Sequence, residues 1–386
     1  MSMRICSLGL ATPKSTFSQS ESAVCARAMF KYTPGEQRGT IIYAKTGIST
    51  RHLVHSREFM DDLLNDTRIT NSIFLPDPGR PQGPTTGERM QYYAREAGPL
   101  AIRASKEALN GFLPESITHL VTISCTGFTA PNVDFELIQS LGLRPTVERV
   151  HIGFMGCHGM LNGLRVANAF VSADSNARVL VCAVELCSLH ISYSDQIDRH
   201  IANSIFSDGA AALVGVAGSP QTDKFHASGS YGNGQSHHSN GVSCATGWTH
   251  SASGSCIIPH SANEMGWTIG DHGFEMSLSR KVPELIQTHL KPWLESWLLE
   301  NGLRYADVGS WAVHPGGIKI LDAVEAALSL PPQSLALSRA VFRDYGNMSS
   351  PTIFFVLDQL MKAGAARPCV AMGFGPGLAV EAAIFR

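Results

Sequence analysis

Charged residues are scarce in this sequence: Asp, Glu, Lys and Arg make up 16% of its 386 residues, against about 25% in an average protein. The formal net charge is −2, so the chain lacks the basic excess with which nucleic-acid-binding proteins attract phosphates. Hydrophobic residues make up 44%, which excludes disorder as the main state, because disordered chains combine low hydrophobicity with high net charge. We expect a thick core or an extensive oligomer interface.

Long apolar runs are also missing. The nearest approach to a membrane-spanning segment is 368–385, and Gly373, Pro376 and Glu381 interrupt it. The N-terminal segment MSMRICSLGLATPKS contains polar residues and Pro13 too early for the apolar region of a signal peptide. We therefore expect a cytoplasmic protein without a membrane span.

The sequence has nine cysteines but no CxxC pair. This absence excludes a zinc ribbon and a thioredoxin-like motif, and no metal site is predicted. Most of the cysteines lie in apolar runs, such as Cys182 in VLVCAVEL, where a free cysteine packs as a small hydrophobe. A reducing compartment is the expected environment.

What the sequence does contain is an alternation of strand and helix patterns. The residues 33–86 and the polar stretch 228–256 read instead as irregular segments, the latter as a loop or mobile hairpin. Ser18 and Glu21 have the spacing of a capping box and predict a helix start. The first half has expected strands at 4–10, 117–124, 149–153, 178–184 and 210–216, with helices at 88–110, 133–141, 194–204 and after Cys157.

The second half repeats this alternation after a boundary near residue 224. Its expected helices are 282–299, 318–330, 333–343 and 351–363, and its expected strands are 310–313, 369–373 and 377–384. Two comparable halves, 1–224 and 225–386, predict a duplicated layered α/β fold, although no sequence repeat is evident.

Cys157 is the first candidate for chemistry. It follows the apolar segment around 149–153 and begins a helix that stays amphipathic to about Ser172, with glycines at 153, 156 and 159 that permit a tight turn. A thiol at a helix N-terminus is expected to have a lowered pKa and to act as a nucleophile. A buried structural cysteine beside a turn would show the same pattern.

Two further residues lie at the ends of elements. His314 ends the apolar strand in SWAVHPGG, and Asn347 in DYGNMSSP precedes a helix. The carboxyl ends of strands are where α/β sheets place their sites. Each residue alone fits a core histidine or an ordinary turn, but Cys, His and Asn together suggest thioester chemistry.

Four long motifs make the sequence similar to a known enzyme family. In chain order they are GFMGCHG (153–159), WAVHPGG (311–317), YGNMSS (345–350) and GFGPGLAVE (373–381). With CTGFTAPNVDFELIQSLGL and SIFSDGAAALV, the chain resembles the type III polyketide synthases, the chalcone synthase-like enzymes, over essentially its whole length. Cys187 in ELCSLH makes it more similar to bacterial and fungal alkylresorcinol or alkylpyrone synthases than to plant chalcone synthase.

The resemblance implies a thiolase fold with a five-layered αβαβα core, a homodimer, and acyl-CoA and malonyl-CoA substrates without a separate cofactor. Cys157 would carry the growing chain as a thioester and form an ion pair with His314. His314 and Asn347 would donate hydrogen bonds to the malonyl thioester oxygen as CO2 leaves. Iterative decarboxylative condensation would then end in ring closure to a resorcinol, pyrone or related product.

The same resemblance assigns pocket residues. Those that would bind substrate are Phe206 and Met276 as gate residues, Cys125 and Cys187 as cavity wall, and Gly375 in the glycine loop. Met265 and Trp267 would form the cavity floor, and the small Ala130 would enlarge it. Lys45 and Arg51 would contact the CoA phosphates, unless they form only a solvated basic patch.

The sequence departs from the plant pattern at His158, where plant enzymes commonly have Phe, and at His190. The alternative function is a ketoacyl synthase III-like enzyme, which shares Cys, His and Asn but performs a single extension. GFGPGL and YGNMSS favour the polyketide branch. The starter, the number of extensions and the product are open.

Overall fold

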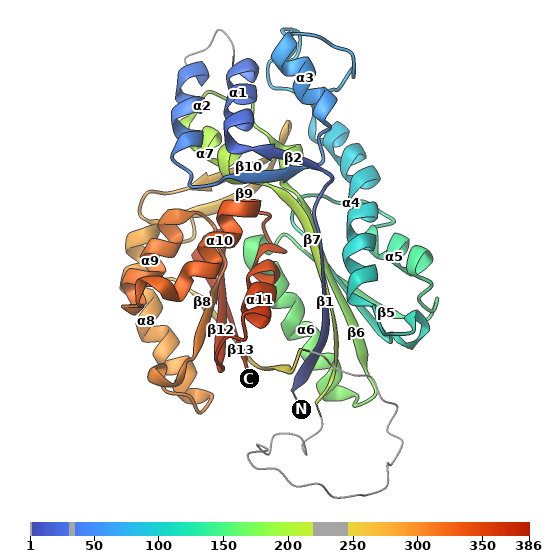
Figure 1. Cartoon of the computed structure of the whole chain (residues 1–386), viewed down its shortest axis with the longest axis vertical. Coiled ribbons are helices and arrows are strands. Elements are labelled where there is room, and N and C mark those ends of the chain that lie inside the picture. Colours follow the sequence, from blue (N-terminus) through green and yellow to red (C-terminus); the bar gives the residue numbers. More distant parts are fainter. Residues whose placement is uncertain (1, 31–34, 219–245) are drawn as a thin grey trace, which may run out of the picture.

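A nine-stranded mixed sheet organises the computed structural model, which describes residues 2–30, 35–218 and 246–386. Figure 1 shows the strands running through the centre of the molecule with helices on both sides. In spatial order the strands are β11 (Ser310–Val313), β12 (Cys369–Gly375), β13 (Ala379–Phe385), β8 (Trp248–Ile257), β1 (Met3–Ala11), β7 (Asp208–Ala217), β6 (Arg178–Leu186), β4 (His119–Ser124) and β5 (Glu148–Gly153).

The alternation of side chains along the strands separates the core into layers. Leu120 of β4 packs with α4 (Thr86–Ala108) and α5 (Val133–Leu141), whereas the next residue, Val121, packs with α6 (Gly159–Ala173) and α11 (Thr352–Lys362). On the other half of the sheet, Val370 faces α8 (Val282–Glu300) and α9 (Ile318–Leu328), and Ala371 faces α6 and α11. The two halves of the nine-stranded sheet thus form two layers, with α6 and α11 between them and the other helices outside. This order of helix, sheet, helix, sheet and helix is the expected five-layered αβαβα thiolase fold.

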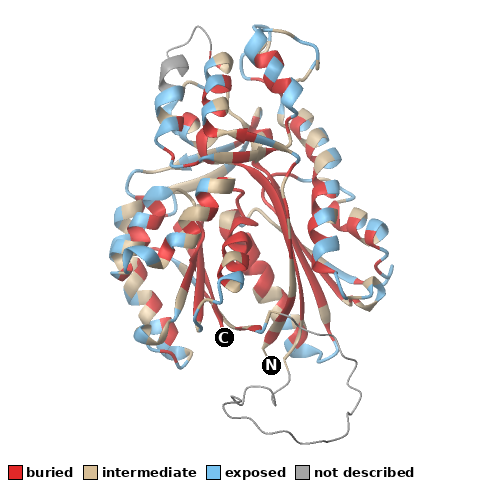
Figure 2. Cartoon of the chain, viewed as in Figure 1, coloured by how far each residue is buried: buried red, intermediate tan, exposed pale blue. Residues whose placement is uncertain are grey.

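The middle layer is the most deeply buried. Ile353, Phe354 and Val356 of α11 are fully buried, as expected for a helix that is apolar on every face. Figure 2 shows burial concentrated in the central strands and the two helices between them. The middle layer therefore holds the two halves together.

Several elements lie where the sequence indicated irregular structure. Within 33–86 the chain forms α2 (Gly35–Ala44), β3 (Thr50–Leu53) and α3 (Arg57–Asn65), with β3 paired to β2 (Ser15–Ser18). The expectation of a loop over 228–256 is wrong from Trp248 onward, because β8 begins there. β8 contains many small or polar residues, and Gly254 packs against the Trp297 ring. The sequence of β8 therefore lacks the hydrophobic pattern by which a strand is recognised. The expected boundary near 224 lies outside the described residues.

The remaining elements complete the upper part of the molecule in Figure 1. They are α1 (Gln19–Met29), α7 (Ile197–Ile205), α10 (Ala336–Tyr345), and the hairpin of β9 (Met265–Gly270) and β10 (Gly273–Leu278). The predicted capping box at α1 is confirmed: the Ser18 hydroxyl accepts from the Glu21 N–H, and the Glu21 carboxylate accepts from the Ser18 N–H. Among the described helices, none has the length and apolar character needed to cross a membrane.

Candidate active site

Cys157 lies in a short 3-10 turn, Gly156–His158, that joins β5 to α6. Gly156 has φ of 75°, and a Cβ at this position would lie 2.2 Å from the Pro376 ring. Only glycine combines this conformation with so close an approach. The turn places the Cys157 thiol at the N-terminal end of α6, as predicted.

The electrostatics of this thiol differ from the prediction. Burial raises the pKa of Cys157 to about 11, although hydrogen bonds from Ser349 and Asn347 act in the opposite direction. The expected lowering by the helix N-terminus is therefore wrong for the free thiol, because burial penalises the thiolate more. Ionisation of Cys157 needs a partner that takes its proton.

His314 is available as that partner. It directly follows β11, its backbone N–H donates to Met372 O at 2.8 Å, and its side chain is buried. Burial, with a smaller contribution from the charge of His158, lowers the pKa of His314 to about 3, so the ring is neutral at pH 7. Neither ring nitrogen has a hydrogen-bond partner among the described residues, so the expected ion pair with Cys157 is not present in this structure.

Asn347 is fixed by its backbone and by its amide. Its N–H donates to Ile205 O at 2.9 Å, and its carbonyl accepts from the Ser207 N–H at 2.8 Å. The side-chain Nδ2 donates to Gly316 O at 3.3 Å, and Oδ1 accepts from the Ser349 N–H at 2.8 Å. A buried amide held in this way is a preorganised hydrogen-bond donor.

The three predicted residues converge around Gly316. A Cβ on Gly316 would lie 4.0 Å from His314 Nε2, and the carbonyl of the same residue accepts from Asn347. The Asn347 amide also acts on Cys157, because it is one of the groups that lower the pKa of this thiol against the effect of burial. Residues separated by up to 190 positions in the sequence thus share one buried site.

Sequence reasoning missed Glu185, a fully buried carboxylate at the end of β6. It accepts from Ser350 Oγ at 2.5 Å, from the Cys125 N–H at 2.9 Å and from Thr126 Oγ1 at 2.7 Å. Burial raises the pKa of Glu185 to about 7. A lone Glu in the apolar strand VLVCAVEL was the signal that could have identified it.

A reaction chamber of about 40 Å³ opens at Cys157. Its wall contains all five pocket residues expected from the sequence: Cys125, Cys187, Phe206, Met276 and Gly375. Met265 and Trp267 line it as well. Ala130, which was expected to enlarge it, is exposed and lines neither this cavity nor the larger one described next.

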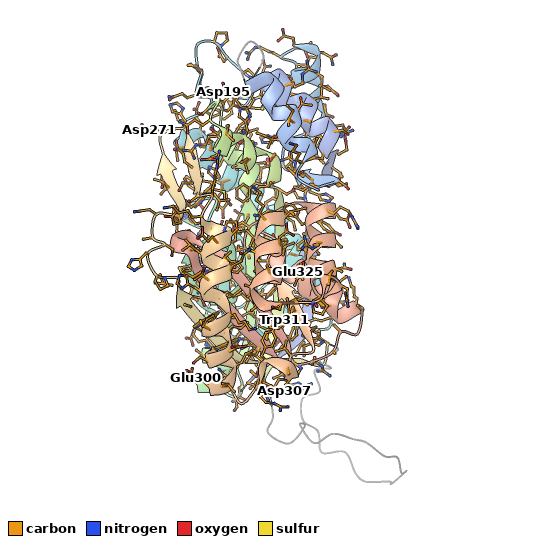
Figure 3. All side chains as sticks on the ribbon, turned by 90° about the vertical axis from the view of Figure 1, so that its left-hand side faces the viewer. Asp195, Asp271, Glu300, Asp307, Trp311 and Glu325 are labelled. Atoms are coloured by element: carbon orange, nitrogen blue, oxygen red, sulfur yellow. The ribbon has the colours of Figure 1, made fainter. Side chains whose placement is uncertain are left out.

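A larger cavity of about 460 Å³ adjoins the chamber and shares Cys187, Phe206, Trp267 and Met276 with it. Apolar side chains of α1 and α3 form much of its wall: Cys25, Ala26, Met29, Phe59, Met60 and Leu63. The exposed Gln82 and Asp271 belong to its rim. Figure 3 shows Asp271 at the end of the molecule that also carries Asp195, away from Glu300 and Asp307.

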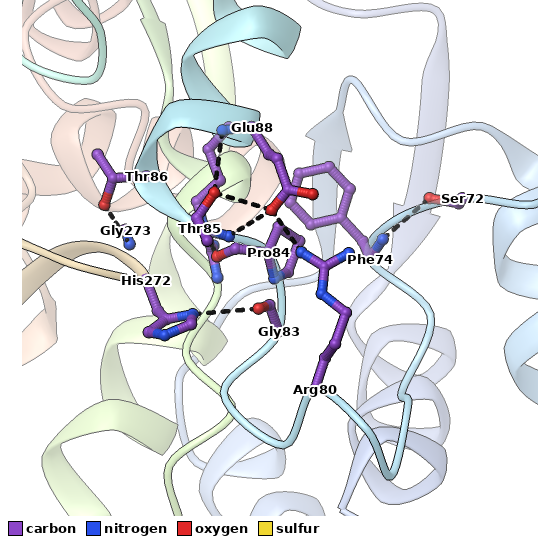
Figure 4. A network of polar contacts seen from close by, with 11 residues as sticks. Ser72, Phe74, Arg80, Gly83, Pro84, Thr85, Thr86, Glu88, His272 and Gly273 are labelled. Atoms are coloured by element: carbon purple, nitrogen blue, oxygen red, sulfur yellow. Dashed lines mark hydrogen bonds and ion pairs between the residues drawn. The ribbon is translucent and has the colours of Figure 1, made fainter.

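The hairpin that carries Trp267 and Met276 is anchored at its turn. Thr86 Oγ1 accepts from the Gly273 N–H at 2.9 Å, and His272 Nδ1 lies 3.1 Å from Gly83 O. Figure 4 shows these contacts beside the capping box at the start of α4, where Thr85 and Glu88 bond reciprocally. The two residues at the chamber are cross-strand partners, so the anchored turn fixes both.

The two predicted CoA ligands lie in different surroundings. Lys45 is exposed just after α2. Arg51 is buried, and its Nη1 donates to Asn203 O at 2.7 Å and to Phe206 O at 3.0 Å. Lys45 is therefore open to a phosphate, whereas Arg51 is engaged inside the protein. In the described part of the chain, no group of three His, Cys, Asp or Glu residues could hold a metal ion.

Known proteins resemble this chain along its full length. The family model for chalcone and stilbene synthases matches residues 2–220 with its N-terminal domain and 250–386 with its C-terminal domain. The α-pyrone synthesis polyketide synthase-like Pks18 of Mycobacterium tuberculosis is 30% identical, over 98% of this chain and 89% of that protein. Bisdemethoxycurcumin synthase of Oryza sativa is 32% identical, over 88% and 81%.

Solved structures agree with these sequences. Polyketide synthase PKS-I from the brown alga Ectocarpus siliculosus superposes with a TM-score of 0.84 at 28% identity, over 100% of this chain and 98% of that one. The C-terminal type III polyketide synthase domain of Steely1 from Dictyostelium gives 0.83 at 27% identity, over 100% and 99%. The chain belongs to the chalcone and stilbene synthase family and is a type III polyketide synthase.

Proposed function

We propose that Cys157, His314 and Asn347 carry out the reaction of this enzyme in three steps. In the first, the Cys157 thiolate attacks the carbonyl carbon of an acyl-CoA, forms the acyl thioester and releases CoA thiol. The raised pKa of the buried Cys157 thiol means that the proton must pass to a neighbouring base. His314, whose ring nitrogens have no partner among the described residues, accepts the proton as the thiolate forms, because the two opposite charges then stabilise each other against the cost of burial.

In the second step, malonyl-CoA loses CO2, and the electron pair of the broken bond becomes an enolate on the thioester. Neutral His314 and the amide of Asn347 donate hydrogen bonds to the enolate oxygen. The observation that carries this step is the Asn347 amide, held in the buried site by Gly316 O and the Ser349 N–H. In the third step, the enolate carbon attacks the acyl carbonyl and expels the Cys157 thiolate, which leaves a β-ketoacyl-CoA two carbons longer.

The larger cavity is the proposed place for the acyl part of the starter and of the growing chain. The larger cavity has a volume of about 460 Å³ and the reaction chamber only about 40 Å³, so the larger cavity offers the room that an acyl chain needs. The apolar residues of α1 and α3 favour an aliphatic rather than a polar chain. Repeated extension with ring closure then gives a pyrone, resorcinol or related product.

The exposed Lys45 is the proposed contact for CoA phosphates, with no cofactor beyond the CoA thioesters. A homodimer is also proposed, because β5 is an edge strand and large apolar side chains are exposed near that edge. They are Phe128, Phe135 and Met155. A cytoplasmic location is also proposed, on the ground that seven of the described cysteines are free, although Cys6 is disulfide-bonded. Sedimentation of the pure protein tests the dimer: a monomer at micromolar concentration would contradict it.

The decisive experiment is incubation of the pure protein with malonyl-CoA and a panel of acyl-CoAs from two to eighteen carbons, with identification of the products by mass. Aliphatic starters extended more than once support the proposal. A single extension, or a requirement for acyl carrier protein, would favour a ketoacyl synthase III-like reaction. An absence of CO2 release from malonyl-CoA would remove the proposed chemistry altogether.

A further inference from the structure

Arg51 joins two parts of the active site through its side chain. Its Nη1 bridges two carbonyls, Asn203 O at 2.7 Å and Phe206 O at 3.0 Å. The second belongs to Phe206, whose ring lies in the wall of both cavities. The first belongs to the last turn of α7, where backbone carbonyls lack helical partners and the helix dipole attracts a cation. Arg51 therefore caps α7 and fixes the backbone of Phe206.

The aliphatic part of the same side chain supports the segment that leads to Asn347. Gly346 has φ of 72°, and a Cβ there would lie 3.4 Å from Arg51 Cγ and 3.1 Å from Ile205 O. Asn347 then pairs with the backbone on both sides of Phe206, through Ile205 O and the Ser207 N–H. The Arg51 side chain therefore contacts both segments of the β-bridge between Phe206 and Asn347. This bridge sets the gate residue Phe206 beside the amide of Asn347.

The guanidinium of Arg51 has partners on one side: Nη1 is bonded, whereas Nε has no hydrogen-bond partner among the described residues, and Arg51 also lines the larger cavity. Its guanidinium lies 5.2 Å from the centroid of the Tyr43 ring, and the Tyr43 hydroxyl donates to Asn203 O at 3.0 Å. No salt bridge joins Arg51 to an acidic residue of the described chain, and its side chain is 5% exposed. Two carbonyls at the end of α7 and an aromatic face are acceptable partners for a buried guanidinium, so the Nη1 side of the group is held by the protein alone.

We propose that Arg51 is a positioning residue for the condensation reaction, which holds Phe206 and Asn347 in register, and not a ligand of CoA. The inference rests on the proposed role of Asn347 in stabilising the enolate. A lysine is not expected to replace Arg51, because its strongly hydrated ammonium lies on a flexible stem, whereas the planar guanidinium holds Nη1 in place between the two carbonyls. Misplacing a reactive group by about 1 Å lowers a rate by on the order of 100-fold. We therefore expect substitution of Arg51 to lower kcat and to change KM little.

The test compares Arg51→Met, Arg51→Lys and Lys45→Met in steady-state kinetics and in malonyl-CoA decarboxylation. Arg51→Met is expected to lower kcat by about 10- to 100-fold, with the KM for malonyl-CoA changed by less than about threefold. Lys45→Met removes an exposed cation that is proposed to contact CoA. This variant is expected to raise the KM for malonyl-CoA and to leave kcat nearly unchanged. Arg51→Lys is expected to resemble Arg51→Met, because the charge alone does not restore both hydrogen bonds.

A second measurement separates positioning from acyl transfer. In a Cys157→Ala background no acyl-enzyme forms, so decarboxylation reports only on His314 and Asn347. Arg51→Met in this background is expected to slow decarboxylation by the same factor as in the native enzyme. The affinity of Arg51→Met for CoA, measured by calorimetry at low and high salt, is expected to equal that of the native enzyme. If Arg51 bound a CoA phosphate, the variant would show a weaker affinity with a smaller salt dependence.

The outcomes are distinct. An unchanged kcat with a raised KM and weakened CoA binding in Arg51→Met would overturn the inference and restore Arg51 as a CoA ligand. Unchanged decarboxylation with slow condensation would limit Arg51 to the gate and also overturn the inference. A failure of the native protein to decarboxylate malonyl-CoA would instead reject the proposed function. Should Arg51→Met not fold, as judged by thermal unfolding, Arg51→Lys provides the same comparison.

Discussion

His190 stacks on Phe274 with their ring centroids 4.0 Å apart and their planes at 13°. The Phe274 N–H donates to His190 Nδ1 at 2.9 Å, so the ring proton lies on Nε2, which is 2.7 Å from Thr126 O. Burial lowers the pKa of His190 to about 3, so the ring remains neutral and keeps this tautomer at physiological pH. With Trp267 perpendicular to both rings, the three side chains form a rigid aromatic wall.

Trp267→Ala is expected to shift the products towards longer chains. Trp267 lines both cavities, and its Nε1 donates to Cys125 O at 2.7 Å, so removing the indole joins the two spaces. Mass analysis of products from one aliphatic acyl-CoA measures the shift. Trp293→Ala, on α8 away from both cavities, serves as the control and should give the native products. An unchanged product spectrum in Trp267→Ala would contradict the role of this wall.

Cys157→Ala is expected to abolish transfer of a radiolabelled acyl group from acyl-CoA to the protein. The loss should be complete, because no other thiol in the described residues combines a position at the start of α6 with Ser349 and Asn347 as the groups that lower its pKa. Cys187→Ala is the matched control, since Cys187 lines the same chamber and burial raises its pKa well above the usual value. Labelling that persists in Cys157→Ala would place the nucleophile elsewhere.

His314→Gln is expected to lower the rate of malonyl-CoA decarboxylation by about 100- to 1,000-fold, the usual loss when one donor to a developing oxyanion is removed. Release of labelled CO2 measures it directly. His289→Gln on α8 controls for substitution of a histidine outside the site. Undiminished CO2 release from His314→Gln would exclude His314 from this step.

His250→Gln is expected to reduce the acid sensitivity of folding. Burial lowers the pKa of His250 to about 4, against about 6.5 in the unfolded chain. As the pH falls from 6.5 towards 4, His250 binds a proton in the unfolded state but not in the folded state. The free energy of unfolding therefore decreases over this pH range.

Urea unfolding at pH 7 and pH 5 makes the comparison. Between these values the native enzyme should lose about 2 kcal/mol more unfolding free energy than the variant. His250 is a suitable position because it lies on β8, with Nε2 3.0 Å from Ser253 Oγ and Nδ1 unpartnered. Equal losses in the two proteins would show that His250 takes up its proton without unfolding.

The sequence was sufficient to predict the elements with clear periodicity. Strands such as 117–124 and helices such as 282–299 appeared close to their expected places, because their apolar residues repeat at the period of the element. β8 could not be predicted, since Gly254 packs against Trp297 and small residues such as Ser253 and Gly254 carry no hydrophobic signal. The same holds for the hairpin at 265–278, whose aromatic residues face cavities and not a sheet.

For the site, residue type and motif were enough to identify Cys157, His314 and Asn347, but not their electrostatics. Whether a helix N-terminus or burial dominates the pKa of Cys157 depends on packing that only the structure gives. Arg51 shows the same limit, because a basic residue in a polar segment reads as a surface cation until its two carbonyl partners are known. The lone Glu185 in an apolar strand could have been noticed, but its role could not be predicted, since its partners come from two distant segments, 124–126 and Ser350.

The position of β1 in the middle of the sheet has a consequence for synthesis. This strand is synthesised long before its two partners, since it pairs with β7 at 210–217 and with β8 at 248–250. The contacts that join the two halves thus have very long sequence separation, which slows folding. An emerging chain would expose an apolar strand with unpaired edges until β7 and β8 have been made, and such a state is prone to aggregation. We therefore expect soluble yield to depend on chaperones and on translation rate more than on the stability of the finished enzyme.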